Sequence, residues 1–337
     1  MFARALTAVA ATLLLTTGCG IAAGNDEDVI RVYSGRHYDL EQAFRQFADE
    51  TGISVEFLYG QDAELLQRIK AEGEDTLADI FMTVDAGNLW AAADNDLLVP
   101  LRSETLRRAV PEGLRDPNER WFALSMRART VMYNPARVEP DQFSDTETYA
   151  GLADPKWSGR LCMRDSSNSY TQSLVASLIG EYGYDGALQI VEGWVANEVK
   201  IMANDISILE TLDAGGCDVA IANHYYLARL LEDDPDLAVT PFWANQESRG
   251  VHVNISGAGV LANSDNPEQA QRLIEWLATT GQNSFVDGNH EYPVNPEVEP
   301  EPVIAGFGEF QYQSVNAEAY GELNAQAVRL MSEAGYE

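Results

Sequence analysis

The chain has 337 residues, of which 45% are hydrophobic and 22% are charged, and its formal net charge is −31 at pH 7. This composition is typical of a folded globular protein, and the acidity excludes a general nucleic-acid-binding role, which needs a basic surface. The length is more than one ordinary hydrophobic core organises, so we expect two α/β lobes.

The first 19 residues have the features of an export signal. Arg4 supplies a positive charge, residues 5–15 form an apolar run, and Cys19 ends a segment that resembles the lipobox of bacterial lipoproteins. The run has the length of a signal-peptide core and is too short to span a membrane. We therefore expect lipidation at Cys19 and a flexible tether over residues 20–28. Simple cleavage to a free periplasmic protein is the alternative.

The first candidate ligands stand between a predicted strand and a predicted helix. Residues 29–33 alternate in the manner of a strand, and an amphipathic helix begins near Asp39. His37 and Tyr38 lie at the turn between them. In open α/β sheets, ligands bind where strands end and helices begin.

A central strand-like segment, residues 126–134, carries two arginines. Arg127 and Arg129 are two positions apart, so their side chains should project to the same face of the strand. An ordinary surface ion pair is the alternative for either of them. Arg36 and Arg229 stand beside candidate ligands and are weaker candidates of the same kind.

Two later strand-to-helix turns carry tyrosines. A predicted strand over residues 160–164 leads through a polar turn to Tyr170, and a buried strand over residues 219–222 leads to Tyr225 and Tyr226. Phenolate oxygens are hard ligands that suit a hard cation. The alternative, half-buried core tyrosines, explains three equivalent turns poorly. Adjacent tyrosines on one strand would face opposite ways, so the strand must end before both can reach one metal.

These motifs resemble those of the ferric-iron-binding proteins of ABC transporters, in extracellular solute-binding protein family 1. The likeness is carried by residues 34–38, 166–170 and 217–226, and it extends through nearly all of the mature chain. Its nearest counterpart is the cyanobacterial-type branch with a tyrosine-rich iron site. The resemblance implies an α/β type II periplasmic binding fold, in which a double crossover hinge joins two α/β lobes.

The lobes are expected to be discontinuous in sequence. The N-terminal lobe should comprise residues 29–127 plus 251–295, and the C-terminal lobe residues 128–250 plus 296–337. The chain should cross between them near residues 127–133 and 249–257. The helical segment 317–334 should pack on the second lobe.

The resemblance also implies a function without catalysis. It indicates the substrate-binding component of an ABC importer, a monomer that captures ferric iron and delivers it to a membrane permease. The implied metal ligands are His37, Tyr38, Tyr170, Tyr225 and Tyr226. Several phenolates on one ion leave a buried negative charge that needs a partner. An arginine, Arg127 or Arg129, would supply it from behind the ligands or hold a synergistic anion such as carbonate.

A second function class stays open at this point. Arginines can grip a carboxylate or phosphate, so the chain could instead be a periplasmic binding protein for a small organic anion. An enzyme is not expected, because no nucleophile or base constellation can be assembled from the sequence.

Two cysteines remain after the leader, Cys162 and Cys217. Export takes the chain to an oxidising compartment, where two remaining cysteines most simply pair. We expect a disulfide between the segments that carry Tyr170 and Tyr225. Thiolate is a soft ligand, which disfavours a metal role for either cysteine.

Overall fold

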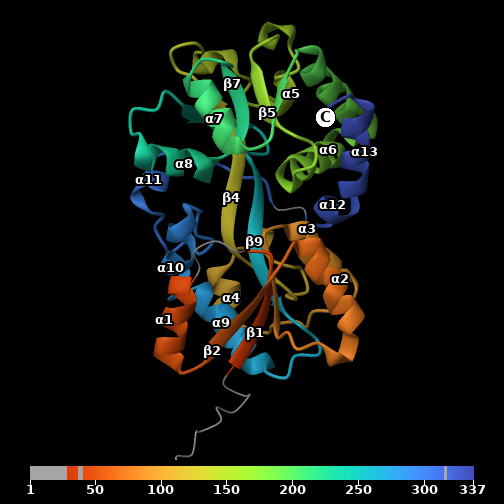
Figure 1. Ribbon diagram of the computed structural model, residues 1–337, viewed down its shortest axis with the longest axis vertical. Helices are drawn as coiled ribbons and strands as arrows, with labels where there is room; N and C mark the ends of the chain where they lie inside the picture. Colours follow the sequence, from red (N-terminus) through yellow and green to blue (C-terminus); the bar gives the residue numbers. More distant parts are fainter. Residues whose placement is uncertain (1–28, 37–40, 315–316) are drawn as a thin grey trace, which may run out of the picture.

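The computed structural model describes residues 29–36, 41–314 and 317–337. Two lobes are stacked along its long axis, and two long strands, β4 (Phe122–Tyr133) and β9 (His252–Val260), run through both (Figure 1). The two-lobed fold and its double crossover are as the sequence predicted. Within the described ranges, no helix is both long and apolar enough to cross a membrane.

The remaining strands form one parallel group in each lobe. β1, β2 and β3 are parallel in the lower lobe, and β5, β6 and β7 are parallel in the upper one. β4 and β9 are antiparallel to each other and to their neighbours. Since they belong to both lobes, hydrogen bonds connect the two groups in one path, β2-β1-β3-β9-β4-β7-β5-β6, with β8 beside β4. These strands are β1 (Val29–Ser34), β2 (Ser54–Tyr59), β3 (Ile80–Thr83), β5 (Leu161–Arg164), β6 (Lys200–Met202), β7 (Val219–Asn223) and β8 (Thr240–Phe242).

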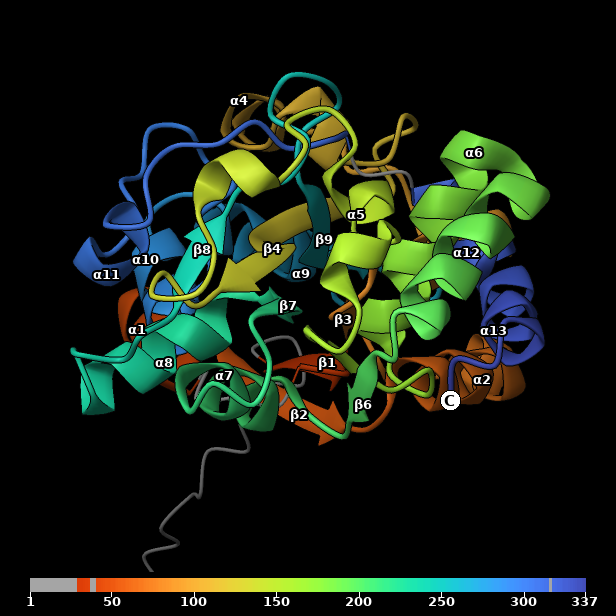
Figure 2. The ribbon, with the colours of Figure 1, turned by 90° about the horizontal axis from the view of Figure 1, so that it is seen from above.

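Helices cover both sides of the strands. Two views agree that α6 and α13 lie on one side of β4 and β9 and that α8 lies on the other (Figures 1 and 2). The helices are α1 (Glu41–Thr51), α2 (Asp62–Glu72), α3 (Ala86–Asp94), α4 (Glu104–Ala109), α5 (Thr148–Gly151), α6 (Ser169–Ala196), α7 (Asp205–Asp213), α8 (His224–Asp233), α9 (Pro267–Leu277), α10 (Gln282–Val286), α11 (Pro302–Ala305), α12 (Ala317–Glu322) and α13 (Asn324–Glu333). Short 3-10 helices are η2 (Gly73–Asp75), η3 (Glu112–Leu114), η4 (Pro140–Gln142), η5 (Pro155–Trp157) and η6 (Asp287–Asn289).

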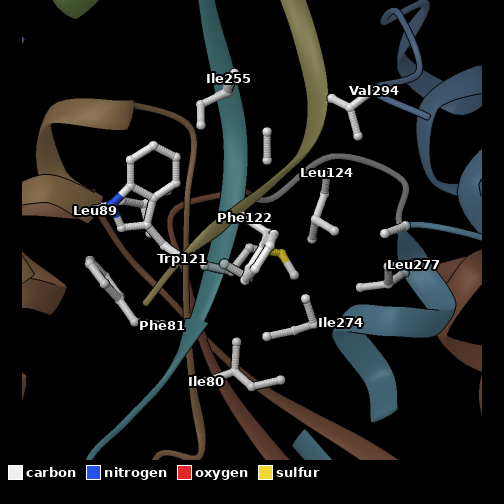
Figure 3. Close-up of a cluster of buried hydrophobic side chains, with 14 of the residues drawn as sticks. Ile80, Phe81, Leu89, Trp121, Phe122, Leu124, Ile255, Ile274, Leu277 and Val294 are labelled. Carbon is white, nitrogen blue, oxygen red and sulfur yellow. The ribbon is translucent and has the colours of Figure 1, made fainter. Parts of the chain in front are cut away.

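Each lobe has its own hydrophobic core. In the lower lobe, side chains from β3, β4, β9, α3 and α9 converge, among them Ile80, Phe81, Leu89, Phe122 and Ile274 (Figure 3). In the upper lobe, Trp157 and Trp194 are fully buried in a second core. Along β4, Ala128 belongs to the first core and Val131 to the second. The two lobes therefore have separate cores, which β4 and β9 connect. The residue boundaries of the two domains stay a prediction.

The C-terminal helices divide between the lobes. α13 packs on α6, as expected for the upper lobe, but α12 lies mainly against α3 of the lower one. Glycines permit this close approach, since a Cβ on Gly321 would lie 2.4 Å from Trp90 and one on Gly87 would lie 2.9 Å from the Gly321 nitrogen. The sequence prediction placed the whole segment 317–334 on the second lobe. This contact between helix backbones was not visible in the hydrophobic pattern.

The predicted disulfide is confirmed. Cys162 and Cys217 are bonded, with their Cα atoms 6.0 Å apart, and both are buried. Cys162 lies in β5, and Cys217 lies just before β7. The bond therefore joins the two segments that lead to the tyrosine turns of the upper lobe.

Thiol titration should find no free thiol in denatured, unreduced protein that lacks Cys19. The bond joins residues 55 positions apart, and in the chain-entropy treatment a loop of that length contributes about 4 kcal/mol to the free energy of unfolding. Replacing both Cys162 and Cys217 with serine should lower that free energy by about the same amount. Two free thiols in the unreduced protein would refute the bond.

Candidate metal centre

A cavity of about 620 Å³ lies between the two lobes. Its lower wall is formed by the end of β1 and the starts of α2 and α3, and its upper wall by the end of β5 and the starts of α6 and α8. Strand ends and helix starts thus meet here, as expected for ligand binding in α/β sheets. The residues that line it include Gly35, Asp62, Asp85, Arg164, Tyr170 and Tyr226.

Tyr170 lies in the first turn of α6, where the sequence predicted it. The side-chain oxygen of Asn168 accepts a hydrogen bond from the Tyr170 backbone N–H at 2.9 Å and so caps the helix. The guanidinium carbons of Arg127 and Arg164 are 5.5 and 5.6 Å from the centre of the Tyr170 ring. Tyr170 therefore combines a fixed backbone, a place on the cavity wall and two neighbouring cations.

Tyr225 and Tyr226 lie in the first turn of α8, because β7 ends at Asn223. The strand thus ends before both tyrosines, as it must if they are to reach one metal, and the centres of their rings are 4.2 Å apart. Tyr226 lines the cavity, whereas Tyr225 is only 1% exposed and packs against the Tyr226 ring. The guanidinium carbon of Arg229 is 5.1 Å from the Tyr225 ring and 5.7 Å from the Tyr226 ring.

The two arginines predicted on β4 have different surroundings. Arg127 donates from Nη2 to the backbone carbonyl oxygens of Val84, in the lower lobe, and of Ile255, on β9, the latter at 2.7 Å. Arg129 is ion-paired with Asp205 at 2.9 Å, and both side chains are buried. Arg127 thus connects the hinge to the cavity wall, while Arg129 is held within the upper lobe.

Arg164 is a cavity residue that sequence reasoning missed. It ends β5, four residues before the cap of α6, and its side chain is 14% exposed. Burial alone would lower the pKa of its guanidinium, but Asp205 and the Tyr226 phenol beside it raise that pKa above its ordinary value. The available signal was its place at the end of the predicted strand 160–164. In open α/β sheets, ligands bind outside the carboxyl ends of the strands, which is where Arg164 lies.

The lower wall of the cavity contains a buried carboxyl, Asp62, which the sequence also did not indicate. Its Oδ2 accepts a hydrogen bond from the Val84 backbone N–H at 3.1 Å, while its buried Oδ1 has no hydrogen-bond partner among the described residues. Burial, and then the charge of Asp85, raise the pKa of Asp62 to about 7. Gly35 makes room for the carboxyl, because a Cβ there would lie 1.5 Å from Oδ1.

Arg36 anchors the chain beside the cavity rather than lining it. It is fully buried, and its Nη1 lies 2.5 Å from Glu291 Oε2 and 2.8 Å from Ser256 Oγ on β9. His37 and Tyr38 follow directly but lie outside the described residues. The anchor therefore ties the start of the predicted ligand segment to a hinge strand.

The other histidines serve the fold. His224 is fully buried and contacts the backbone of Ala128, so it does not point into the cavity, and burial lowers its pKa to about 4. His252 is also buried, with its pKa lowered to about 3. Across the described part of the chain, no group of three or more His, Cys, Asp or Glu side chains is arranged to hold a metal ion. The residues that line the cavity include Tyr170, Tyr226, Asp62 and Asp85.

Comparison with known proteins gives one consistent family. Residues 75–304 match the family described as bacterial extracellular solute-binding protein. The chain is similar to Iron uptake protein A1 of Synechocystis sp., at 41% identity over 92% of this chain and 88% of that protein. It is also similar to the Fe(3+)-binding periplasmic protein of Serratia marcescens, at 27% identity over 97% and 96% of the two chains.

Solved structures give the same result. A Trichodesmium protein in complex with iron and citrate has a TM-score of 0.85 and 42% identity, covering 92% of this chain and 100% of that one. Apo FutA2 from Synechocystis has a TM-score of 0.84 and 38% identity, covering 92% and 99% of the two chains. The fold and its connections are therefore those of these structures.

Proposed function

Because the chain belongs to the bacterial extracellular solute-binding protein family, we propose that it captures ferric iron for an importer. Its relatives are an iron uptake protein and an Fe(3+)-binding periplasmic protein. A solute-binding protein delivers its ligand to a transporter and performs no catalysis. The partner in this proposal is the membrane permease of an ABC transporter.

One observation carries the proposal: Tyr170 and Tyr226, from two different helix starts, border the same inter-lobe cavity, and the Tyr225 ring lies against that of Tyr226 at 4.2 Å. A ferric ion is hard and highly charged, so phenolate oxygens are its matched ligands. A bound cation strongly favours the deprotonated form of its ligands, which allows phenols to coordinate at neutral pH. The proposed ligands are His37, Tyr38, Tyr170, Tyr225 and Tyr226.

Binding would couple to lobe closure. In the proposal, His37 and Tyr38 approach from the lower lobe and the three later tyrosines from the upper one. A ligand that is completed only by both lobes stabilises the closed form selectively. The strands β4 and β9, which run through both lobes, are the elements about which such a movement would occur.

The arginines of β4 supply positive charge behind these ligands. Arg127 suits this role better than Arg129, because Arg127 lies against the Tyr170 ring whereas Arg129 is neutralised by Asp205. A synergistic anion such as carbonate would occupy any coordination position that the protein leaves open, next to an arginine. Arg164 also lines the cavity wall. Because a guanidinium binds carboxylates well, this residue favours the alternative ligand, a small organic anion.

Protein loaded with ferric citrate and then desalted should retain one iron per chain and show an orange to red band from phenolate-to-iron charge transfer. Metal analysis and the visible spectrum measure both quantities on one sample. A colourless, iron-free protein that binds citrate equally well without iron would identify an organic-anion binder instead.

Export and anchoring complete the proposal. Cys19, outside the described residues, would be lipidated and would anchor a monomeric protein to the membrane, facing the periplasm, through the tether 20–28. Intact mass of the mature protein distinguishes this from simple cleavage, because lipid adds mass to the fragment that begins at Cys19.

A further inference from the structure

Arg164 lines the cavity, and few contacts satisfy its guanidinium. Its Nε and Nη1 atoms are buried and have no hydrogen-bond partner among the described residues. The carboxylate facing it, Asp205, is 3.8 Å from Nη1, beyond hydrogen-bond distance. Burying a cation with so few hydrogen bonds costs free energy unless an anionic or hydrogen-bonding partner binds to it.

Asp205 pairs more closely with Arg129 than with Arg164, which only its Oδ1 faces, at 3.8 Å. Its Oδ2 lies 2.9 Å from Arg129 Nη1 and accepts the Asn223 backbone N–H at 3.1 Å. Asp205 is fully buried and thus neutralises Arg129 at close range. One carboxylate therefore faces two guanidiniums, and one positive charge remains in excess at Arg164.

This excess charge lies next to two candidate ligands. Arg164 lines the cavity together with Tyr170 and Tyr226. Its guanidinium carbon is 5.6 Å from the centre of the Tyr170 ring, and the Tyr226 phenol is beside it. At such distances in a partly buried site, a positive charge acts strongly on a developing phenolate.

We propose that Arg164 supplies the charge that balances the phenolates of Tyr170 and Tyr226 and holds Tyr226 in position when ferric iron binds. The inference rests on the proposed function. A ferric ion with four phenolates carries one net negative charge, and a buried net charge needs compensation. The positive charge at Arg164 is opposite in sign to this net charge and offsets it from the upper wall, while Arg127 offsets it from the hinge. Arg164 acts through the tyrosines without touching the metal.

The neighbouring arginines have other main contacts. Arg127 donates to the backbone carbonyl oxygens of Val84 and Ile255, which fixes it between the hinge and the lower lobe. Arg229 lies over the Tyr225 and Tyr226 rings, and its Nη2 donates to Asn289 Oδ1 at 3.3 Å. Arg164 lies on the upper wall of the cavity. Asp205 pairs more closely with Arg129, so most of the positive charge of Arg164 is left to act on the cavity.

The test compares Arg164→Gln with Arg164→Lys, and uses Arg160→Gln as a matched control. Arg160 is four residues earlier, is also partly exposed and is ion-paired with Asp218 at 2.7 Å, but it does not line the cavity. Ferric affinity is measured by competition with citrate, and each iron-loaded protein gives a visible spectrum. Thermal unfolding of the iron-free proteins verifies that each variant is folded.

Arg164→Gln should weaken ferric affinity by about 10- to 100-fold, the usual range for a residue that supports metal ligands. Its charge-transfer band should move to longer wavelength, because phenolate electrons are less stabilised when the cation is gone. Arg164→Lys should recover part of the affinity, and Arg160→Gln should match the unmodified protein. If the unmodified protein is coloured and Arg164→Gln keeps its affinity and its band, the inference is overturned.

Two further results separate the possible failures. An unmodified protein that binds no iron contradicts the proposed function, and with it the role of Arg164. If Arg164→Gln does not fold, Asp205→Asn leaves Arg164 in place and removes the carboxylate that faces it. Its band should then move to shorter wavelength, and an unchanged or longer wavelength would overturn the inference.

Discussion

Changing Tyr226 to phenylalanine should lower the affinity for ferric iron by at least about a hundredfold, more than the loss of a residue that only supports a ligand. The substitution removes one oxygen and little volume, so the helix start and the packing against Tyr225 at 4.2 Å should persist. Iron would lose a hard, anionic ligand that neither the ring nor water replaces in charge. The charge-transfer band should also shift, because fewer phenolates contribute to it.

Chelator competition on the iron-loaded protein, with a visible spectrum at each step, measures both effects. Tyr184→Phe is the matched control, since Tyr184 lies on α6, away from the cavity, and its hydroxyl donates to Glu333 at 2.9 Å. The control should behave as the unmodified protein does. If Tyr226→Phe kept the unmodified spectrum and affinity, Tyr226 would not be a ligand.

The iron-free protein should lose stability on acidification in a way that depends on His252. Burial lowers its pKa from 6.5 to about 3 in the folded state. Nδ1 faces the Gln313 amide nitrogen at 2.8 Å, and Nε2 faces the Ser173 hydroxyl at 3.2 Å. The neutral ring fits these contacts by accepting at Nδ1 and donating at Nε2, whereas a charged ring would direct a second N–H at a donor.

The sign of the effect follows from the order of protonation. On acidification the unfolded chain gains this proton first, near pH 6.5, so the contribution of His252 is present above that pH and declines toward pH 3. The free energy of unfolding should fall through this group by about 1.4 kcal/mol per pH unit. Asp62, whose raised pKa works in the opposite direction, makes the total slope an unsuitable readout.

Comparison with His252→Gln isolates the effect. Between pH 6 and pH 4 the unfolding free energy of the unmodified protein should fall relative to that of the variant, by about 1.4 kcal/mol per pH unit. Denaturant unfolding of both proteins at several pH values gives this difference. Parallel curves would show that His252 is not held neutral in the folded protein.

The elements that position the candidate site were predictable because they follow from local pattern. Buried strands ending at Arg164 and Asn223 are short apolar runs, and the polar residues after them start helices. The disulfide was predictable from export and from the count of two remaining cysteines. Tyr225 and Tyr226 required only that the strand end before them, and β7 does so.

Other features depend on residues that are far apart in sequence. Asp205, the partner of Arg129, is 76 residues away from it, so no local pattern reveals that Arg129 is neutralised. For the same reason, the incompletely neutralised charge of Arg164 becomes apparent only when the positions of Arg129, Arg164 and Asp205 are all known. Asp62 reads as an ordinary helix start, and its burial depends on the space left by Gly35. The packing of α12 on α3 likewise depends on glycine contacts across the lobes.

The central claim is that tyrosine phenolates bind a ferric ion in the cavity between the lobes. Resonance Raman spectroscopy of the iron-loaded protein, excited within its visible band, tests it most directly, because only vibrations of groups bonded to the absorbing iron are enhanced. We expect the ring and C–O modes of coordinated phenolate, reduced in intensity in Tyr226→Phe. An iron-loaded protein whose enhanced spectrum lacks phenolate modes would contradict the claim.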